Sequence, residues 1–244
     1  ARAVGVSYVG VRNSNHCGAM AYWAMLALEH DLIGVCATNA GINMAPWGGK
    51  ERLIGNNPLA IAVPTNRPWP MVLDMATSVA AGGKLDVAII KGEPIPEGWA
   101  LDPDGRPTTD PVAGRKGSLV PVGGPKGYGL AVMLDVLCGV LAGGRFGKGL
   151  GGRGSSHFFM AIKIDGLMPS AEFKASLDAL IDQIHASPLA PGFDRIAVPG
   201  EIEYELSVRR EREGIPVEGP VLAELEELAV SFGVEERPSR WRAG

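Results

Sequence analysis

The sequence is poor in several features that would place a protein in a class at once. It contains only three cysteines and 6% aromatic residues, and its basic and acidic residues nearly balance at a net charge of −4. No run of basic residues is longer than a pair. A surface built to neutralise nucleic-acid phosphates needs clustered positive charge, so we expect no nucleic-acid partner.

The few cysteines argue against disulfides and zinc. Cys17, Cys36 and Cys138 make an odd number, lack CxxC spacing and have small or apolar neighbours. Such residues are typical of reduced thiols in the core of a cytoplasmic protein. We therefore expect no metal site and a cytoplasmic location.

Long hydrophobic runs are also missing. The longest mostly apolar stretch, residues 128–142, contains Asp135 and is too short to span a bilayer. No secretory signal opens the chain, so we expect no membrane association. The chain begins on Ala1 without Met and leads directly into a predicted strand, which suggests that a further N-terminal segment precedes it.

What is present indicates a large core of both helices and strands. The chain has 244 residues and is 46% hydrophobic, which suits one large domain or two unequal ones. Apolar runs predict strands at 4–11, 32–38, 59–63, 71–75, 157–162 and 195–198. Helical spacing and cap residues predict helices at 19–30, 125–141, 170–187, 203–213 and 220–232. A boundary near Asp165 divides a mixed α/β part, residues 1–165, from a helical part, residues 166–244.

Two segments are rich in turn-forming residues. Residues 92–111 combine proline, glycine and aspartate and predict a long surface excursion with little regular structure. Residues 143–154 are rich in glycine and contain a formal GxGxxG at Gly147, Gly149 and Gly152. A Rossmann fingerprint follows a strand and opens a helix, whereas this one follows a helix and leads into a strand. We therefore expect a non-Rossmann fold.

Histidine 16 stands out because it lies on a predicted turn between a strand and a helix, in the segment Arg12-Asn13-Ser14-Asn15-His16-Cys17-Gly18. Loops held between rigid elements often carry function. Histidine also exchanges protons near neutral pH. The alternative is that His16 caps the helix or packs against it. The other histidine at a strand, His157, is interpreted as structural.

Three further turns can bind a small ligand. Thr38-Asn39-Ala40-Gly41 follows a buried strand, and Asp74-Met75-Ala76-Thr77-Ser78 follows another, with Thr77 or Ser78 as a possible helix cap. Lys126 lies among glycines at the start of a helix, where free N–H groups suit phosphate or carboxylate. The alternatives are that Lys126 is simply exposed to water and that Asp74 is itself a cap.

The sequence closely resembles the malate/L-lactate dehydrogenase family of NAD(P)-dependent oxidoreductases, which is distinct from the Rossmann-type lactate and malate dehydrogenases. The resemblance covers nearly the whole chain and rests on seven segments in order. These are residues 12–18, Thr38-Asn39, Ala45-Pro46-Trp47-Gly48-Gly49, Gly55-Asn56-Asn57-Pro58-Leu59-Ala60, residues 74–78, Gly124-Pro125-Lys126-Gly127-Tyr128-Gly129-Leu130 and Pro199-Gly200-Glu201.

The resemblance implies a fold, a reaction and a cofactor. The expected fold is α/β (α+β), with a non-Rossmann mixed-sheet cofactor domain and a helical domain formed by both chain ends, assembled as a homodimer. The expected reaction transfers a hydride between NAD or NADP and a small 2-hydroxy acid or 2-oxo acid. Some members of the family instead reduce cyclic imino acids, and that alternative stays open.

The resemblance also implies roles for particular residues. His16 corresponds to the family's proton acceptor, and Asn39 lies at the substrate. The cofactor-binding positions correspond to Ala40, Asp74, Met75, Ala76, Lys126, Gly200 and Glu201. Because residue 40 is alanine, it can contact the cofactor through its backbone but not through a side-chain hydroxyl.

Two departures from the family keep other functions open. No R-x-x-x-S-H-G segment, which supplies a second histidine in some members, precedes Val4, and the loop at 143–156 is short and rich in glycine. The chain can therefore be a dinucleotide-binding remnant without turnover, or a purely structural dimer subunit. Binding of NADH with turnover indicates an enzyme. Binding alone indicates the remnant, and the absence of both indicates the structural subunit.

Overall fold

The computed structural model describes residues 1–150 and 154–235. The chain forms two compact units, Ala1–Gly200 and Glu201–Gly244. The first unit holds all the candidate site residues except Glu201. The predicted boundary near Asp165 separates a cofactor-binding domain from a helical part, and it stays a prediction. The first compact unit is a different division of the chain, and it extends to Gly200.

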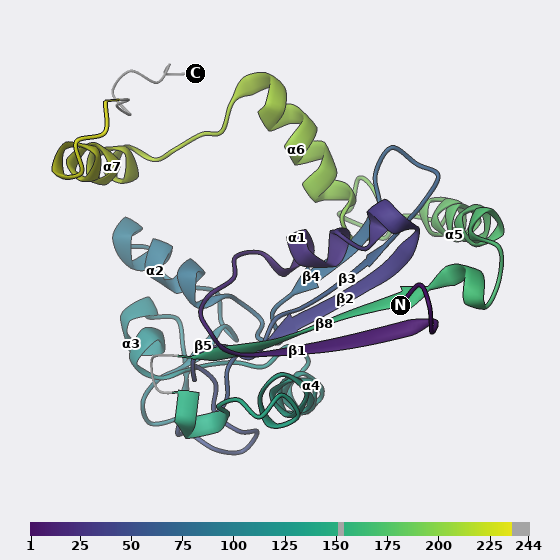
Figure 1. Ribbon diagram of the computed structural model, residues 1–244. Coiled ribbons are helices and arrows are strands. Elements are labelled where there is room, and N and C mark those ends of the chain that lie inside the picture. The colour runs from purple at the N-terminus through teal and green to yellow at the C-terminus, as the bar shows by residue number, and fades with distance from the viewer. Residues whose placement is uncertain (151–153, 236–244) are drawn as a thin grey trace. The chain divides into compact units, whose positions relative to one another are not determined.

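A five-stranded sheet is the centre of the first unit (Figure 1). The strand order is β1-β8-β2-β3-β4, and neighbouring strands are antiparallel. The bounds are Val6–Ser14 for β1, Leu32–Thr38 for β2, Leu59–Val63 for β3, Met71–Met75 for β4 and Ser155–Lys163 for β8. The predicted strands at 32–38, 59–63 and 71–75 are confirmed at both ends.

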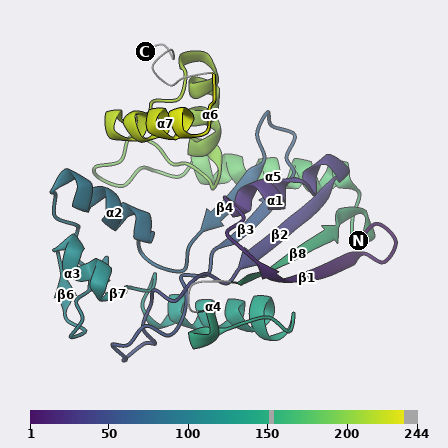
Figure 2. The same ribbon diagram turned by 60° about the vertical axis from the view of Figure 1, so that its left-hand side comes forward.

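Helices cover both faces of this sheet (Figures 1 and 2). Helix α1, Met20–Met25, continues as the 3-10 turn η1, Leu28–His30, and packs Met20 and Ala24 against Cys36, Ala60 and Ala62. Glycine is required at position 34, where α1 packs on β2, because a Cβ on Gly34 would lie 1.9 Å from the carbonyl oxygen of Ala24.

Helix α4, Pro125–Asp135, lies on the opposite face and continues as a π-helical turn, Val136–Val140. Leu134 and Cys138 pack there against Ala37 and Phe158. Successive residues of a strand point to opposite faces, so Cys36 faces α1 and Ala37 faces α4. Strand β2 is therefore buried on both sides, as its continuous apolar run predicted.

A second, smaller sheet has the order β6-β5-β7, formed by Pro107–Thr108, Ala100–Leu101 and Ser118–Leu119. Helices α2, Gly82–Lys91, and α3, Pro111–Lys116, pack beside it. Leu85, Ile95 and Leu119 are among the residues of their shared core. Residues 92–111 thus contain two short strands within the predicted surface excursion.

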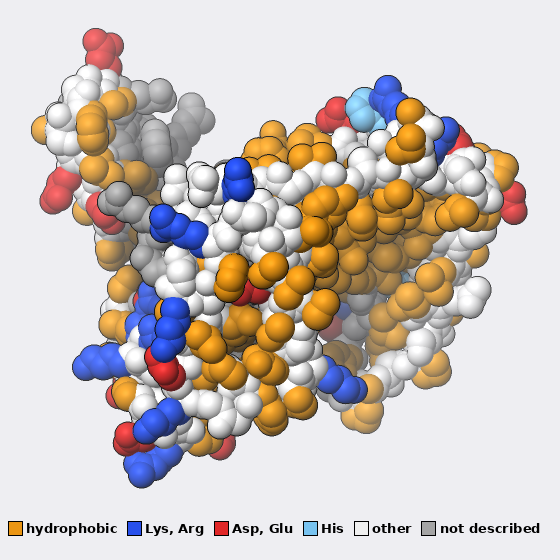
Figure 3. Space-filling view, turned by 60° about the horizontal axis from the view of Figure 1, so that its bottom comes forward, with side chains coloured by type: hydrophobic (Ala, Val, Ile, Leu, Met, Phe, Trp, Pro, Cys, Tyr) orange, Lys and Arg blue, Asp and Glu red, His pale blue; other side chains and the backbone are white. Residues whose placement is uncertain are grey.

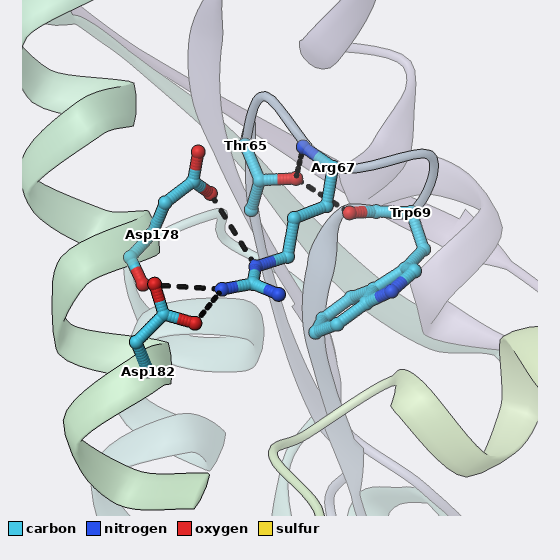
Figure 4. Close-up of polar contacts among 5 residues, drawn as sticks. All are labelled: Thr65, Arg67, Trp69, Asp178 and Asp182. Carbon is cyan, nitrogen blue, oxygen red and sulfur yellow. Dashed lines mark hydrogen bonds and ion pairs between the residues drawn. The ribbon is translucent and has the colours of Figure 1, made fainter. Parts of the chain in front are cut away.

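Helix α5, Ser170–His185, follows β8 and the 3-10 turn η4, Ile164–Gly166. It is joined to the β3–β4 loop by Arg67, whose Nη2 lies 2.6 Å from Asp182 Oδ1 and whose Nε lies 3.6 Å from Asp178 Oδ1 (Figure 4). The guanidinium also lies 5.8 Å from the ring centroid of Trp69. One arginine thus fixes the loop to the helix.

Several local predictions were wrong. Residues 195–198 form no strand. Pro169, not Ser170, is the N-cap of α5, because the backbone at Ser170 is already helical. The hydroxyl of Ser78 donates to the carbonyl of Ala80 and caps no helix, since α2 begins only at Gly82.

The second unit contains helices α6, Glu201–Glu213, and α7, Gly219–Ser231, close to the predicted bounds. Across the chain, the predicted α/β fold class is confirmed. The expected mixed sheet is antiparallel at each paired strand, and antiparallel pairing excludes the parallel βαβ units of a Rossmann fold. In the glycine-rich segment, Gly147–Leu150 form the 3-10 turn η3, and Gly152 lies outside the described residues.

Hydrophobic side chains gather over a broad part of the surface on the side where α4 lies (Figure 3). Met133, Val140 and Leu141 are among the exposed residues of α4 and the turns that follow it. Among the described residues, no helix combines the length and the apolar character needed to cross a bilayer.

Candidate active site

The turn that carries His16 forms where β1 separates from its neighbour. Val11 still pairs with His157 on β8, and the register then shifts before Ser14. Asn13 adopts φ +58° within this irregularity. Pairing resumes after this bulge at Ser14, opposite Ser155, and residues 15–19 then connect β1 to α1, which begins at Met20. His16 is exposed there.

One backbone contact orients the His16 ring. The amide of Gly18 donates to Nδ1 of His16 at 3.0 Å. Gly18 has φ +80°, a conformation that glycine adopts without strain. Because Nδ1 accepts this bond, the neutral ring carries its proton on Nε2. His16 therefore presents an Nε2–H donor in this conformation.

Asp74 lies close to the same turn. Its Oδ2 accepts a hydrogen bond from the amide of Ala21 at 2.8 Å. Ala21 is in the first turn of α1, whose own N-cap residue, Ala19, has no side chain able to cap. A carboxylate from β4 therefore caps this helix in place of a local residue, and carboxylates also suit the positive end of a helix. The structure thus brings Asp74 next to the segment that carries His16.

The residues after Asp74 connect this region to the start of α4. The carbonyl of Thr77 accepts from the amide of Val122 at 2.9 Å, and Ser78 forms an isolated bridge with Pro121. Thr77 is fully buried, and its Oγ1 has no hydrogen-bond partner in the described part of the chain. A buried hydroxyl without a partner is uncommon, so this segment has polar capacity left for a ligand.

Lys126 stands exposed in the first turn of α4. The helix begins after Gly124, where φ is +64° and a Cβ would lie 3.0 Å from the Trp47 ring. Within residues 1–150 and 154–235, Lys126 has no ion-pair partner. A cation beside a free helix N-terminus suits a phosphate or carboxylate group.

Asn39 is fully buried and its side chain is committed to the protein. Its Nδ2 donates to Asp135 Oδ1 at 2.9 Å and to the carbonyl of Arg145 at 2.8 Å. Its Oδ1 accepts from the amide of Ser156 at 2.7 Å. Asp135 Oδ2 in turn accepts from the amide of Gly147 at 3.1 Å. We call Asn39 and Asp135 the buried polar pair; their observed role is to hold loops together, and a substrate contact of Asn39 stays a prediction.

Ala40 and Gly200, two further predicted cofactor positions, have backbone contacts within the first unit. The amide of Ala40 donates to Asn57 Oδ1 at 2.8 Å, so its backbone N–H is already used. Gly200 has φ +89° and packs on β4, because a Cβ there would lie 2.8 Å from the amide nitrogen of Val72. Strand β4 therefore carries Asp74 and Met75 and also supports Gly200. Glu201 is the first residue of the second unit.

His157 lies beneath the His16 turn and is only 2% exposed. Its Nδ1 is 2.7 Å from Thr38 Oγ1 and 3.8 Å from Cys17 Sγ. Burial lowers the pKa of His157 below its usual value, and the charge of His16 lowers it further. Burial also raises the pKa of the Cys17 thiol, which makes it a poor nucleophile.

Sequence reasoning missed the partners that shape the site. Asp135 was seen only as a charge in an apolar stretch. The hydrogen bond from the Trp23 indole to the Cys17 carbonyl and the contacts of Asn57 were not predicted. Their partners lie far along the chain or depend on side-chain direction, so no spacing could reveal them. The described residues contain no group of His, Cys, Asp or Glu able to hold a metal ion.

Comparison with known proteins identifies the class and then the family. The strands of the two described sheets pair antiparallel, unlike those of a Rossmann domain. A family model for malate/L-lactate dehydrogenase matches residues 1–226. The chain therefore belongs to the malate/L-lactate dehydrogenase family and is an oxidoreductase, as the sequence motifs predicted.

Relatives and solved structures agree. A malate dehydrogenase of Pyrococcus abyssi is 43% identical over 248 residues, covering 96% of this chain and 68% of the relative. The structure of sulfolactate dehydrogenase from Methanocaldococcus jannaschii is 39% identical with a TM-score of 0.86, covering 98% of this chain and 70% of that one. A malate dehydrogenase structure from Entamoeba histolytica gives a TM-score of 0.90 at 30% identity, covering 96% and 71%. Relatives named for NAD(+) and for NADP(+) both occur, as the predicted cofactor, NAD or NADP, allowed.

Proposed function

We propose that the protein transfers a hydride between NAD or NADP and a small 2-hydroxy acid or 2-oxo acid, with His16 as the acid/base. The observation that carries this proposal is the exposed His16 ring on the turn just before α1, the helix that Asp74 caps, with Nδ1 bonded to the Gly18 amide in the resting form. The names of relatives, which are malate, sulfolactate and ureidoglycolate dehydrogenases, support this substrate class.

The residues present fit a dinucleotide. Asp74 can accept hydrogen bonds from hydroxyl groups, and Lys126 at the start of α4 can pair with phosphate. Met75, Ala76, Ala40 and the Gly200–Glu201 turn complete the set proposed to hold the cofactor. When bound, the nicotinamide supplies the hydride chemistry. The protein's own task is then to orient the two reactants and to handle one proton.

His16 handles that proton at Nε2. To accept the proton of a substrate hydroxyl, Nε2 must be unprotonated, so the neutral ring must carry its proton on Nδ1. To return it, the ring must be an imidazolium, again with a proton on Nδ1. Both forms require the Gly18 amide to release Nδ1, because two N–H groups cannot face one another. The observed form is therefore a resting state of the ring.

A binding titration followed by an activity assay tests the proposal. NADH and NADPH fluorescence is titrated with the protein, and a panel of 2-oxo acids, with a cyclic imino acid, is then added. Binding with oxidation of the coenzyme by a 2-oxo acid supports the proposal. Turnover of the imino acid alone indicates an imino acid reductase. Binding without any turnover indicates a dinucleotide-binding remnant.

We also propose a homodimer, as the family resemblance implies. The exposed hydrophobic side chains on the α4 side are more extensive than isolated surface residues and suit a protein interface. Sedimentation at several protein concentrations tests this. A monomer at all concentrations contradicts it.

A further inference from the structure

The peptide unit between Cys17 and Gly18 makes two hydrogen bonds in opposite directions. Its N–H donates to Nδ1 of His16 at 3.0 Å. Its C=O accepts from the indole Nε1 of Trp23 at 2.8 Å. The two groups of a peptide unit lie in one plane and point in opposite directions. A contact that fixes the carbonyl therefore also fixes the N–H.

Trp23 is well placed to hold this carbonyl. It lies within α1, only six residues after Cys17, and its ring makes an edge contact with Phe159 at 5.8 Å between centroids and another with Tyr22 at 5.2 Å. The helix itself is anchored by Met20 and Ala24 in the core and by Asp74 at its start. The indole lies at the surface, where Trp23 is 36% exposed, and its ring contacts and the anchored helix hold it in place.

The backbone at Gly18 has room for this peptide unit to rotate. Gly18 has φ +80°, and no atom lies within 4 Å of the position that a Cβ would take. Glycine imposes no steric preference on such a rotation. On the other side of Gly18, Ala19 has no side chain that could hold the turn by a hydrogen bond.

We propose that Trp23 is a positioning residue for His16: by holding the Cys17 carbonyl it aims the Gly18 amide at Nδ1 and sets the tautomer of the His16 ring. While the indole holds the carbonyl, the neutral ring carries its proton on Nε2. Rotation of this peptide unit releases Nδ1, which the proton-transfer forms of the ring require. Trp23 therefore connects the conformation of the turn to the protonation state of His16. The mechanistic consequence rests on the proposed function, but the tautomer itself does not.

The test reads the tautomer directly by ¹⁵N NMR of histidine-labelled protein at a pH where His16 is neutral. Wild type is compared with Trp23→Phe, which keeps an aromatic ring but removes the indole N–H. The matched control is Trp99→Phe, because Trp99 packs near Lys84 in the core of the small sheet, and no contact among the described residues joins it to residues 15–18. A His16→Gln sample assigns the His16 signals.

The expected result is an Nε2–H tautomer in wild type and in Trp99→Phe, with the share of Nδ1–H rising about fivefold in Trp23→Phe, the equivalent of one lost hydrogen bond. Amide exchange at Gly18 should accelerate in Trp23→Phe alone. A wild-type ring protonated on Nδ1, or a tautomer ratio that Trp23→Phe leaves unchanged, overturns the proposal.

A measurement on wild type alone covers the case in which Trp23→Phe does not fold. As pH falls and His16 takes a second proton, the indole N–H of Trp23 should lose protection from exchange together with the Gly18 amide. The titrations of the neighbouring groups His157 and Asp74 are followed through their own NMR signals, so that their effects can be told apart from that of His16. An indole that stays protected while His16 becomes doubly protonated contradicts the proposal. Since none of these readouts uses turnover, their failure is distinct from a failure of the dehydrogenase assay.

Discussion

The His16 turn and the Asn39 turn look alike in sequence but differ in the structure. Each places small polar residues after a strand, at the ends of β1 and β2. His16 is exposed and is bonded through Nδ1 to the Gly18 amide, whereas Asn39 is fully buried with both ends of its amide bonded to the protein. The comparison teaches that a polar turn after a strand can be a site or a support, and that burial and hydrogen bonding decide which.

The largest effect is expected at the exposed turn. His16→Ala should lower kcat by roughly 10²–10⁴-fold, the usual contribution of a general acid/base, and leave the cofactor Kd unchanged. Steady-state kinetics and an NADH titration measure both. His30→Ala, which changes another exposed histidine, is the control. A fully active His16→Ala variant would remove His16 from the mechanism.

The next effect is on stability and lies at the buried turn. Asn39→Ala removes three hydrogen bonds and leaves the Asp135 carboxylate short of a donor, so the free energy of unfolding should fall by about 3 kcal/mol. Urea unfolding measures this. Asn56→Ala, which removes one bond from Asn43, should cost about 1 kcal/mol. Equal losses in the two variants would show that the buried polar pair has no special role.

Helix α4 repeats the contrast between its two ends, with Lys126 exposed at the start and Asp135 buried at the end. Lys126→Ala should raise the cofactor KM about tenfold while lowering kcat less, because one charge-assisted contact to phosphate is lost. Lys91→Ala, at the exposed end of α2, is the matched control. Unaltered binding of NADH and NADPH by Lys126→Ala would contradict the phosphate role.

The smallest effect concerns His157, which lies beneath the His16 turn. Burial lowers its pKa in the folded state, so the unfolded chain binds a proton first as the pH falls. Its contribution to stability is therefore full above about pH 6.5 and is lost below that value. His157→Gln should make the free energy of unfolding less sensitive to pH across the range in which histidine titrates, from about pH 7.5 to about pH 5.5. An unchanged pH slope would show that another group causes the acid sensitivity.

Much of the fold could be predicted because strand periodicity is local. The bounds of β2, β3 and β4 follow from short apolar runs between turn residues, and those runs were found in the sequence. Asp74 shows the limit of such reasoning. It was expected to bind a ligand or to cap a nearby helix, and it caps α1, which lies 53 residues earlier in the chain.

By itself, the sequence determined the family and the α/β fold class, because these follow from ordered motifs and from hydrophobic spacing. The residues proposed for the site stay predictions. Only the tertiary structure decided what each polar residue does. Burial and hydrogen-bond partners depend on residues from distant segments, such as Asp135 for Asn39 and Asp74 for α1. The tautomer of His16 depends on the direction of one peptide N–H, which no pattern of residue types specifies.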